Sequence, residues 1–182
     1  MKYQWWLLVA LSLFLVGLVL GVVIPVDADG VLAEELAALR ELGKVLTPFT
    51  LPMAAFILVK NVSALLLSFA FSPLLCVVPV LSLLLNGGLV AVLSVRVAEE
   101  TSLGWVLAAL LPHGILEIPA FIIGEAAALS FGTWAMIALI SPEGRRRFPS
   151  RVKPSLRYLA IACGLLVPAA FVETFLTPLL VG

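Results

Sequence analysis

Charged side chains are scarce in this sequence: Asp, Glu, Lys and Arg together make up 12% of its 182 residues, against 63% hydrophobic residues. A soluble domain contains about 25% charged residues, so this chain lacks the polar surface that a soluble protein needs. Its net charge of zero argues against nucleic acid as a partner. Its mean hydropathy of +1.20 places most of its surface in lipid, where only structures that bond every backbone group internally are stable. The sequence therefore predicts an all-α protein of the cell membrane, a polytopic bundle of transmembrane helices that forms a single domain over residues 1–182.

Motifs that carry enzymatic chemistry are also lacking. The chain has one histidine and no HExxH motif, which argues against a metalloprotease. It has no phosphate-binding glycine loop and no serine-hydrolase elbow. The two cysteines, Cys76 and Cys163, stand in separate apolar runs without a CxxC motif, and we interpret both as lipid- or core-facing. No catalytic residue is predicted, and the sequence does not favour an enzyme.

Long hydrophobic segments are what the sequence has instead. They cover residues 5–24, about 49–71, 74–95, 103–140 and 156–181. The first is about 20 residues long, enough to cross a bilayer, and its Gly17 and Gly21 form a GxxxG motif that can serve as a packing face. A signal peptide is the alternative, but its apolar core should be shorter and a convincing small-residue cleavage site is missing. We therefore predict a retained first helix.

The charges between the hydrophobic segments predict the orientation. Residues 142–157 hold six Lys and Arg against Glu143 alone, so this loop is expected in the cytoplasm. The 25–48 stretch, which is mostly acidic, and the short 96–102 loop are expected outside. These assignments agree if residues 103–140 make one net crossing. The result is five crossings, with the N-terminus cytoplasmic and the C-terminus outside.

The 103–140 segment is too long for one ordinary crossing. The simplest solution breaks it at Pro112, because proline lacks the N–H that continues a helix. A re-entrant half-helix at 103–111 would then dip in from outside, and a longer helix over about 114–140 would cross to the cytoplasm. A single long, kinked helix is the alternative.

Residues 31–46 predict a different kind of helix. Five leucines fall on one helical stripe, and the charged residues lie off it. This pattern is typical of an amphipathic helix that lies on the outer surface or caps the bundle.

Ionisable residues inside the apolar segments are the candidates for function. They are Lys60, His113, Glu117, Glu125 and Glu173. Such residues are costly in hydrocarbon and usually face a bundle interior, in pairs or at a functional site. His113 and Glu117 are four residues apart and share one helix face. Glu173 is expected at the same depth, so we expect His113, Glu117 and Glu173 to converge.

The charge balance among these residues leaves two explanations open. With His113 neutral, three glutamates face one lysine, so either the carboxyl groups are protonated or a cation lies among them. An imidazole with carboxylates suits a divalent metal such as zinc, with His113, Glu117 and Glu173 as its ligands. The expected surrounding residues are Asn61, Asn86, Lys60 and Glu125. The alternative is a hydrogen-bonded network that only ties helices together.

Four stretches of the sequence carry a resemblance to a known family. They are KNVSALLLSF, LSLLLNGGLVAVLSV, LLPHGILEIPAFIIGEAAALSFG and FVETFLTPLL. In this order they resemble the stage II sporulation protein M family over roughly 55–182, with the PHGxxE-P segment the most specific part. The resemblance implies a polytopic fold and recurring residues at Asn61, Asn86-Gly87, Pro112-His113-Gly114, Glu117, Glu173 and Thr177-Pro178. In endospore formers, the family's member works in a membrane complex with cell-wall hydrolases.

Three function classes follow. The leading one is a membrane scaffold or complex subunit with a polar, metal-binding site inside the membrane. Its expected partners are membrane lipids, a second copy of the chain, and a membrane or cell-envelope protein. The alternative is a permease-like transport subunit that needs a separate ATPase or an ion gradient. An intramembrane hydrolase is the least favoured.

Overall fold

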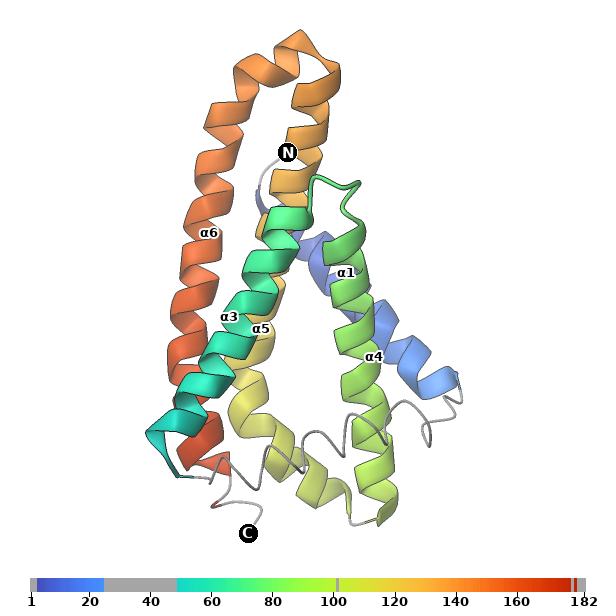
Figure 1. The fold of residues 1–182 in the computed structure, drawn as a ribbon. Helices are drawn as coiled ribbons and strands as arrows, with labels where there is room; N and C mark the ends of the chain where they lie inside the picture. The colour runs from blue at the N-terminus through green and yellow to red at the C-terminus, as the bar shows by residue number, and fades with distance from the viewer. Residues whose placement is uncertain (1–2, 25–48, 101, 178, 180–182) are drawn as a thin grey trace.

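The described part of the chain is all helical. The computed structural model describes residues 3–24, 49–100, 102–177 and 179, and for residues 100, 103 and 105–113 it describes the backbone only. Within these ranges the helices are α1 (Tyr3–Val23), α3 (Leu51–Phe71), α4 (Val77–Glu100), α5 (Leu103–Ile140) and α6 (Pro142–Phe175), as Figure 1 shows. All five are long and apolar enough to cross a membrane, which confirms the predicted helix bundle. The amphipathic helix predicted at 31–46 lies outside the described residues.

Helix α5 corrects one expectation. It is continuous from Leu103 to Ile140, so the half-helix predicted at 103–111 is wrong and the alternative, one long helix, holds. In Figure 1 the yellow-green start of α5 runs at an angle to the rest of the helix. A proline removes one backbone hydrogen bond and bends a helix, and neighbouring helices can support the bend. Helix α6 likewise continues through Pro149, Pro154 and Pro168.

Helix α6 corrects a second expectation. Residues 142–157, predicted as a charged loop, form its first half. The side chain of Ser141 caps the helix by accepting a hydrogen bond from the backbone N–H of Gly144 at 2.8 Å. Arg147 pairs with Glu143 one turn before it. Arginine and lysine are good helix formers, so the charge of this stretch does not interrupt the helix. Helix α4 also extends to Glu100, into the 96–102 stretch predicted as a loop.

Helix α5 separates two hydrophobic cores. The first core contains Trp6, Ala10 and Phe14 of α1, Cys76, Leu83 of α4, and Ile122, Ala126 and Leu129 of α5. The second contains Leu65 and Phe69 of α3, Ala120, Ala127 and Ala128 of α5, and Leu159, Ala162 and Leu166 of α6. The consecutive residues Ala126 and Ala127 therefore face different cores. Their small side chains allow neighbouring helices to approach closely. Every other described helix packs on α5.

Glycines bring α1 and α4 together. A Cβ atom at Gly17 would meet the backbone of Leu84, and one at Gly21 would meet the backbone of Gly88. From the opposite side, a Cβ atom at Gly87 would meet the carbonyl oxygen of Phe14. The GxxxG motif of α1 therefore lies in this interface, where the two backbones are in contact.

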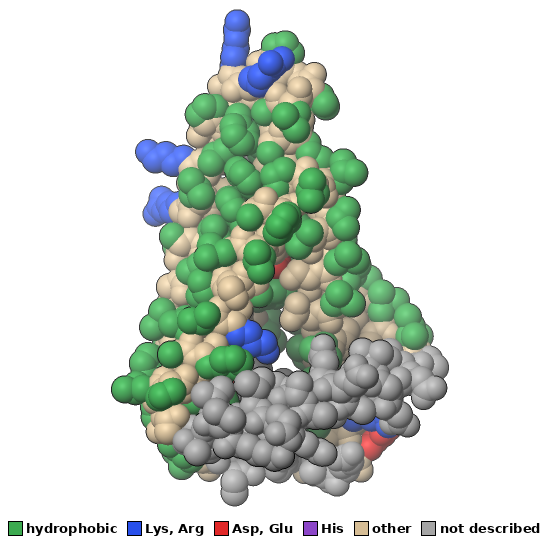
Figure 2. Space-filling view, in the orientation of Figure 1, with side chains coloured by type: hydrophobic (Ala, Val, Ile, Leu, Met, Phe, Trp, Pro, Cys, Tyr) green, Lys and Arg blue, Asp and Glu red, His purple; other side chains and the backbone are tan. Residues whose placement is uncertain are grey.

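The α5–α6 hairpin projects beyond the other helices. Gly132 of α5 lies against the carbonyl oxygen of Ser72, at the turn that joins α3 to α4, so the hairpin beyond Gly132 has passed the end of α3 and α4 (Figure 1). The 34 residues of α6 span about 51 Å, whereas the hydrocarbon core is about 30 Å thick. We call residues 135–149 the hairpin tip. Figure 2 shows Lys and Arg at this end of the molecule and along one side, and hydrophobic side chains over most of the viewed face.

A candidate polar site between three helices

Glu125 is the most deeply buried carboxyl group among the described residues. It lies in α5, and 1% of its surface is exposed. Its Oε2 accepts a hydrogen bond of 2.6 Å from the hydroxyl of Ser68 in α3. Its Oε1 accepts one of 2.7 Å from the hydroxyl of Ser82 in α4. A buried carboxyl group without such partners would cost several kcal/mol, on the order of 3, so these bonds connect three helices at one point.

Glu117 lies two turns before Glu125 on the same helix. Its Oε1 accepts a hydrogen bond of 3.2 Å from the side-chain amide of Asn61. Asn61 and Ser68 are seven residues apart on α3, so both pairs follow one interface between α3 and α5. Between them Leu65 packs over Gly124, where a Cβ atom would lie 2.8 Å from a Leu65 methyl carbon.

We call Asn61, Ser68, Ser82, Glu117 and Glu125 the polar strip. Its members come from α3, α4 and α5, and α3 and α4 diverge from the turn that joins them (Figure 1). Figure 2 shows the viewed face hollowed between these two helices. The strip therefore follows the line along which α3 and α4 separate over α5.

Asn86 and Lys60, which were expected to surround the site, are not part of the polar strip. The Asn86 amide donates a hydrogen bond of 2.8 Å to the carbonyl oxygen of Ser82, in the preceding turn of its own helix. Both Asn86 and Lys60 are exposed. Neither is joined to the polar strip by a side-chain hydrogen bond between helices among the described contacts. Of the expected surrounding residues, Asn61 and Glu125 are the ones that bridge helices.

The predicted metal ligands are described in part. The side chain of His113 lies outside the described residues, so its convergence with Glu117 and Glu173 stays a prediction. Glu173 is half-buried in α6. Among the side chains that the structure describes, no three of His, Cys, Asp and Glu lie close enough together to hold a metal ion.

Contacts between α5 and α6 give the register of these two helices near the hairpin tip. The two helices are antiparallel: Gly144 packs on Ile137, and the guanidinium of Arg151 lies over the ring of Trp134. This register holds for the second half of α5; the first part of α5 runs at an angle to it (Figure 1), so the position of Glu173 relative to His113 stays a prediction.

Sequence reasoning missed two members of the polar strip, Ser68 and Ser82. A serine in an apolar segment costs little, so neither stood out. The available signal was spacing: Ser68 comes seven residues after Asn61, and Ser82 comes four before Asn86, so each lies on a helix face with a more obvious polar residue.

The chemistry of the strip is that of hydrogen bonding. It provides two carboxyl groups, two hydroxyls and one amide. Each hydroxyl donates to a carboxyl oxygen of Glu125. The arrangement is suited to joining helices and to holding a proton.

Comparison with known proteins places these residues in a family. The model of the family described as stage II sporulation protein M matches residues 10–178. An uncharacterized protein of Methanocaldococcus jannaschii is 31% identical over 124 residues, which are 67% of this chain and 69% of that protein. No solved structure gives a significant match. The family match includes most of α1, which the resemblance found in the sequence motifs left out.

Proposed function

Because the chain belongs to the stage II sporulation protein M family, we propose that it is a scaffold subunit of a membrane complex, and that its hairpin tip holds a partner protein. The supporting observation is the projection of this tip beyond the other described helices (Figure 1). A helix that only spans the membrane does not need the additional length of about 20 Å that α6 provides.

The surface of the hairpin tip supports a docking role. Leu139 is 77% exposed and Ile140 is 83% exposed, at the end of α5. Beside them Arg145 and Arg146 are exposed. Large apolar side chains that project from the bundle into water mark an interaction site. The complementary partner surface is apolar with acidic residues around it.

The proposal includes the orientation of the chain. The basic start of α6 favours the cytoplasm for the hairpin tip. A single cysteine at Ser150, after Cys76 and Cys163 are replaced by alanine, should resist an impermeant thiol reagent in intact cells and react after the cells are opened. Labelling of this cysteine in intact cells would contradict the orientation.

The docking role is tested by the size of the complex. In mild detergent extracts of native membranes, the double variant Leu139→Ser, Ile140→Ser should release the protein from its complex on a native gel. The matched control is Leu74→Ser in the α3–α4 turn, which is 62% exposed at the same end of the bundle. If the complex persists in the double variant, or is lost equally in the control, the tip is not the docking element. A complex that contains this chain alone would point to a homo-oligomer.

A metal in the polar centre is the finer form of this proposal. The Asn61–Glu117 hydrogen bond supports it, because such a bond is of the kind that orients a metal ligand. Purified protein should then contain about one divalent ion per chain, and His113→Ala or Glu117→Ala should reduce this to background. The control Glu125→Gln should keep the ion. Background metal content in the unaltered protein would leave the hydrogen-bonded network as the explanation.

The permease-like alternative has one observation in its favour, the polar strip where α3 and α4 diverge. The continuous helix α5 counts against it, because discontinuous helices form the binding sites of many transporters. Proton uptake into proteoliposomes that Glu125→Gln abolishes would favour transport over scaffolding.

A further inference from the structure

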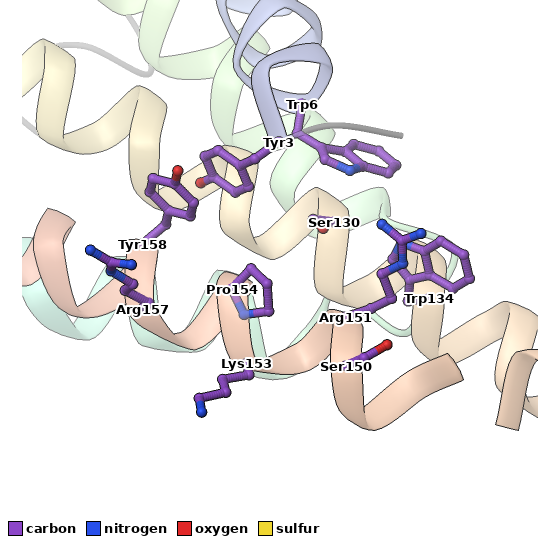
Figure 3. A pocket seen from close by; sticks show the side chains of 10 residues that line it. All are labelled: Tyr3, Trp6, Ser130, Trp134, Ser150, Arg151, Lys153, Pro154, Arg157 and Tyr158. Carbon is purple, nitrogen blue, oxygen red and sulfur yellow. The ribbon is translucent and has the colours of Figure 1, made fainter. Parts of the chain in front are cut away.

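A cavity of about 820 Å³ lies between the beginning of α1, the second half of α5 and the first half of α6. Figure 3 shows its lining side chains: Tyr3 comes from α1, Trp134 from α5, and Arg151, Lys153, Arg157 and Tyr158 from α6. Its volume is in the range of small-molecule sites. It is separate from the polar strip and contributes nothing to the proposed docking at the hairpin tip.

Three cations and no acid are found among the described residues that line this cavity. The cations are Arg151, Lys153 and Arg157. The guanidinium of Arg151 lies 4.8 Å from the centre of the Trp134 ring, which holds it in place by a cation–π contact. Lys153 and Arg157 are exposed. A group of this composition favours an anion, and guanidinium and ammonium groups are the usual ligands of phosphate in proteins.

Aromatic side chains form a fixed wall of the cavity. The rings of Tyr3 and Tyr158 are stacked, with their centres 3.5 Å apart. The Tyr3 hydroxyl also donates a hydrogen bond of 2.9 Å to the carbonyl oxygen of Ile123 in α5. Because the wall is held from three helices, the cavity exists without a ligand and does not have to form on binding.

The cavity lies at the depth of the lipid headgroups. Tyrosine and tryptophan gather at the boundary between hydrocarbon and headgroups, and Tyr3 is the first residue of α1. Arg157 is the last charged residue of α6 before the apolar stretch that ends at Glu173. A ligand in this cavity therefore has cations on one side and hydrocarbon directly below it.

We propose that this cavity binds the phosphodiester headgroup of an anionic phospholipid. Arg151 and Arg157 face the phosphate, while Lys153, whose side chain points away from the aromatic wall in Figure 3, adds positive charge at the rim of the cavity. The aromatic wall contacts the glycerol region, and the acyl chains continue into the bilayer along the bundle. Position distinguishes a lipid from free phosphate as the source of the anion: the exposed Ile161 lies one turn beyond Arg157 on the same face of α6 and presents an apolar surface that a free ion does not need.

The test is native mass spectrometry of the full chain in detergent with phosphatidylglycerol or phosphatidylcholine added. The unaltered protein should retain phosphatidylglycerol in preference to phosphatidylcholine. The double variant Lys153→Gln, Arg157→Gln should bind phosphatidylglycerol about tenfold more weakly. The control Arg145→Gln, Arg146→Gln removes the same charge from exposed side chains outside the cavity and should change binding by less than about twofold.

Three results would overturn the proposal. One is an equal loss of binding in the two double variants, which would mean that general surface charge attracts the lipid. Another is equal retention of phosphatidylcholine and phosphatidylglycerol by the unaltered protein. The third is displacement of phosphatidylglycerol by millimolar inorganic phosphate, which would assign the cavity to the free ion. Both altered side chains are exposed, and unchanged thermal unfolding of each variant confirms that the fold is intact.

Discussion

Glu125 in the polar strip and Glu143 in the hairpin tip show how differently two regions of this molecule use a carboxyl group. Glu125 is 1% exposed and accepts hydrogen bonds from helices α3 and α4. The Glu143 side chain is 72% exposed and pairs with Arg147 one turn along its own helix. The first carboxyl group joins separate elements, and the second only supports the helix that carries it. Stability should therefore depend on the strip much more than on the tip.

Replacing these two glutamates by alanine should give the largest difference in the free energy of unfolding. Glu125→Ala leaves the hydroxyls of Ser68 and Ser82 without their acceptor and creates a void, so the free energy of unfolding should fall by about 3 kcal/mol. Glu143→Ala should change it by about 0.5 kcal/mol or less, because an exposed pair contributes little. Unfolding by SDS in mixed micelles measures both. Similar losses in the two variants would erase the distinction between the regions.

Replacing glycines by alanine should give the next largest difference in the free energy of unfolding. Gly87→Ala places a Cβ atom against the carbonyl oxygen of Phe14 in α1, so α1 and α4 must separate, at a cost of about 2 kcal/mol. A Cβ atom at Gly164 of α6 would meet nothing within 4 Å, so Gly164→Ala should stabilise the helix by about 0.5 kcal/mol. The same unfolding measurement applies. A tolerated alanine at Gly87 would show that the α1–α4 contact is not close.

Replacing serines by alanine should give the smallest difference in the free energy of unfolding. The Ser68 hydroxyl donates to Glu125 of another helix, and the Ser63 hydroxyl donates to the carbonyl oxygen of Lys60 in its own helix. Ser68→Ala should lower the free energy of unfolding by about 1 kcal/mol, and Ser63→Ala by only a few tenths, about 0.2 kcal/mol. In the background of Glu125→Ala, the effect of Ser68→Ala should largely disappear. Additive losses in the double variant would mean that the two side chains do not interact.

The helices themselves were predictable because hydrophobic length is a direct signal for a membrane span. The first segment was predicted at residues 5–24, and α1 covers Tyr3–Val23. The second was predicted at about 49–71, and α3 covers Leu51–Phe71. The start of α6 was not predictable by the same signal, since charge reports whether a residue lies in hydrocarbon and says nothing of whether its backbone is helical. The break predicted at Pro112 was wrong for a related reason: a proline lowers the local preference for helix, but it does not by itself decide whether the helix ends, and α5 continues through it.

The polar strip was harder to predict than the helices. Hydropathy marks Glu117 and Glu125 as unusual, and spacing places Asn61 and Ser68 on one face of α3. Neither signal says which helix that face meets. The pairing of α3 with α5 depends on how all the described helices fit together, and so Ser82, which comes from a third helix, became visible only in the structure.

The divergence of α3 and α4 has a consequence for biosynthesis. Helices that are neighbours in the chain separate here, so that α4 packs on α1 while α3 packs on α5 and α6. As the chain leaves the ribosome, α4 finds α1 already in the membrane, and this pair can close through its glycines. Helix α3 is made earlier than either of its main partners, α5 and α6. Until α5 is made, the hydrogen bonds from Asn61 to Glu117 and from Ser68 to Glu125 cannot form.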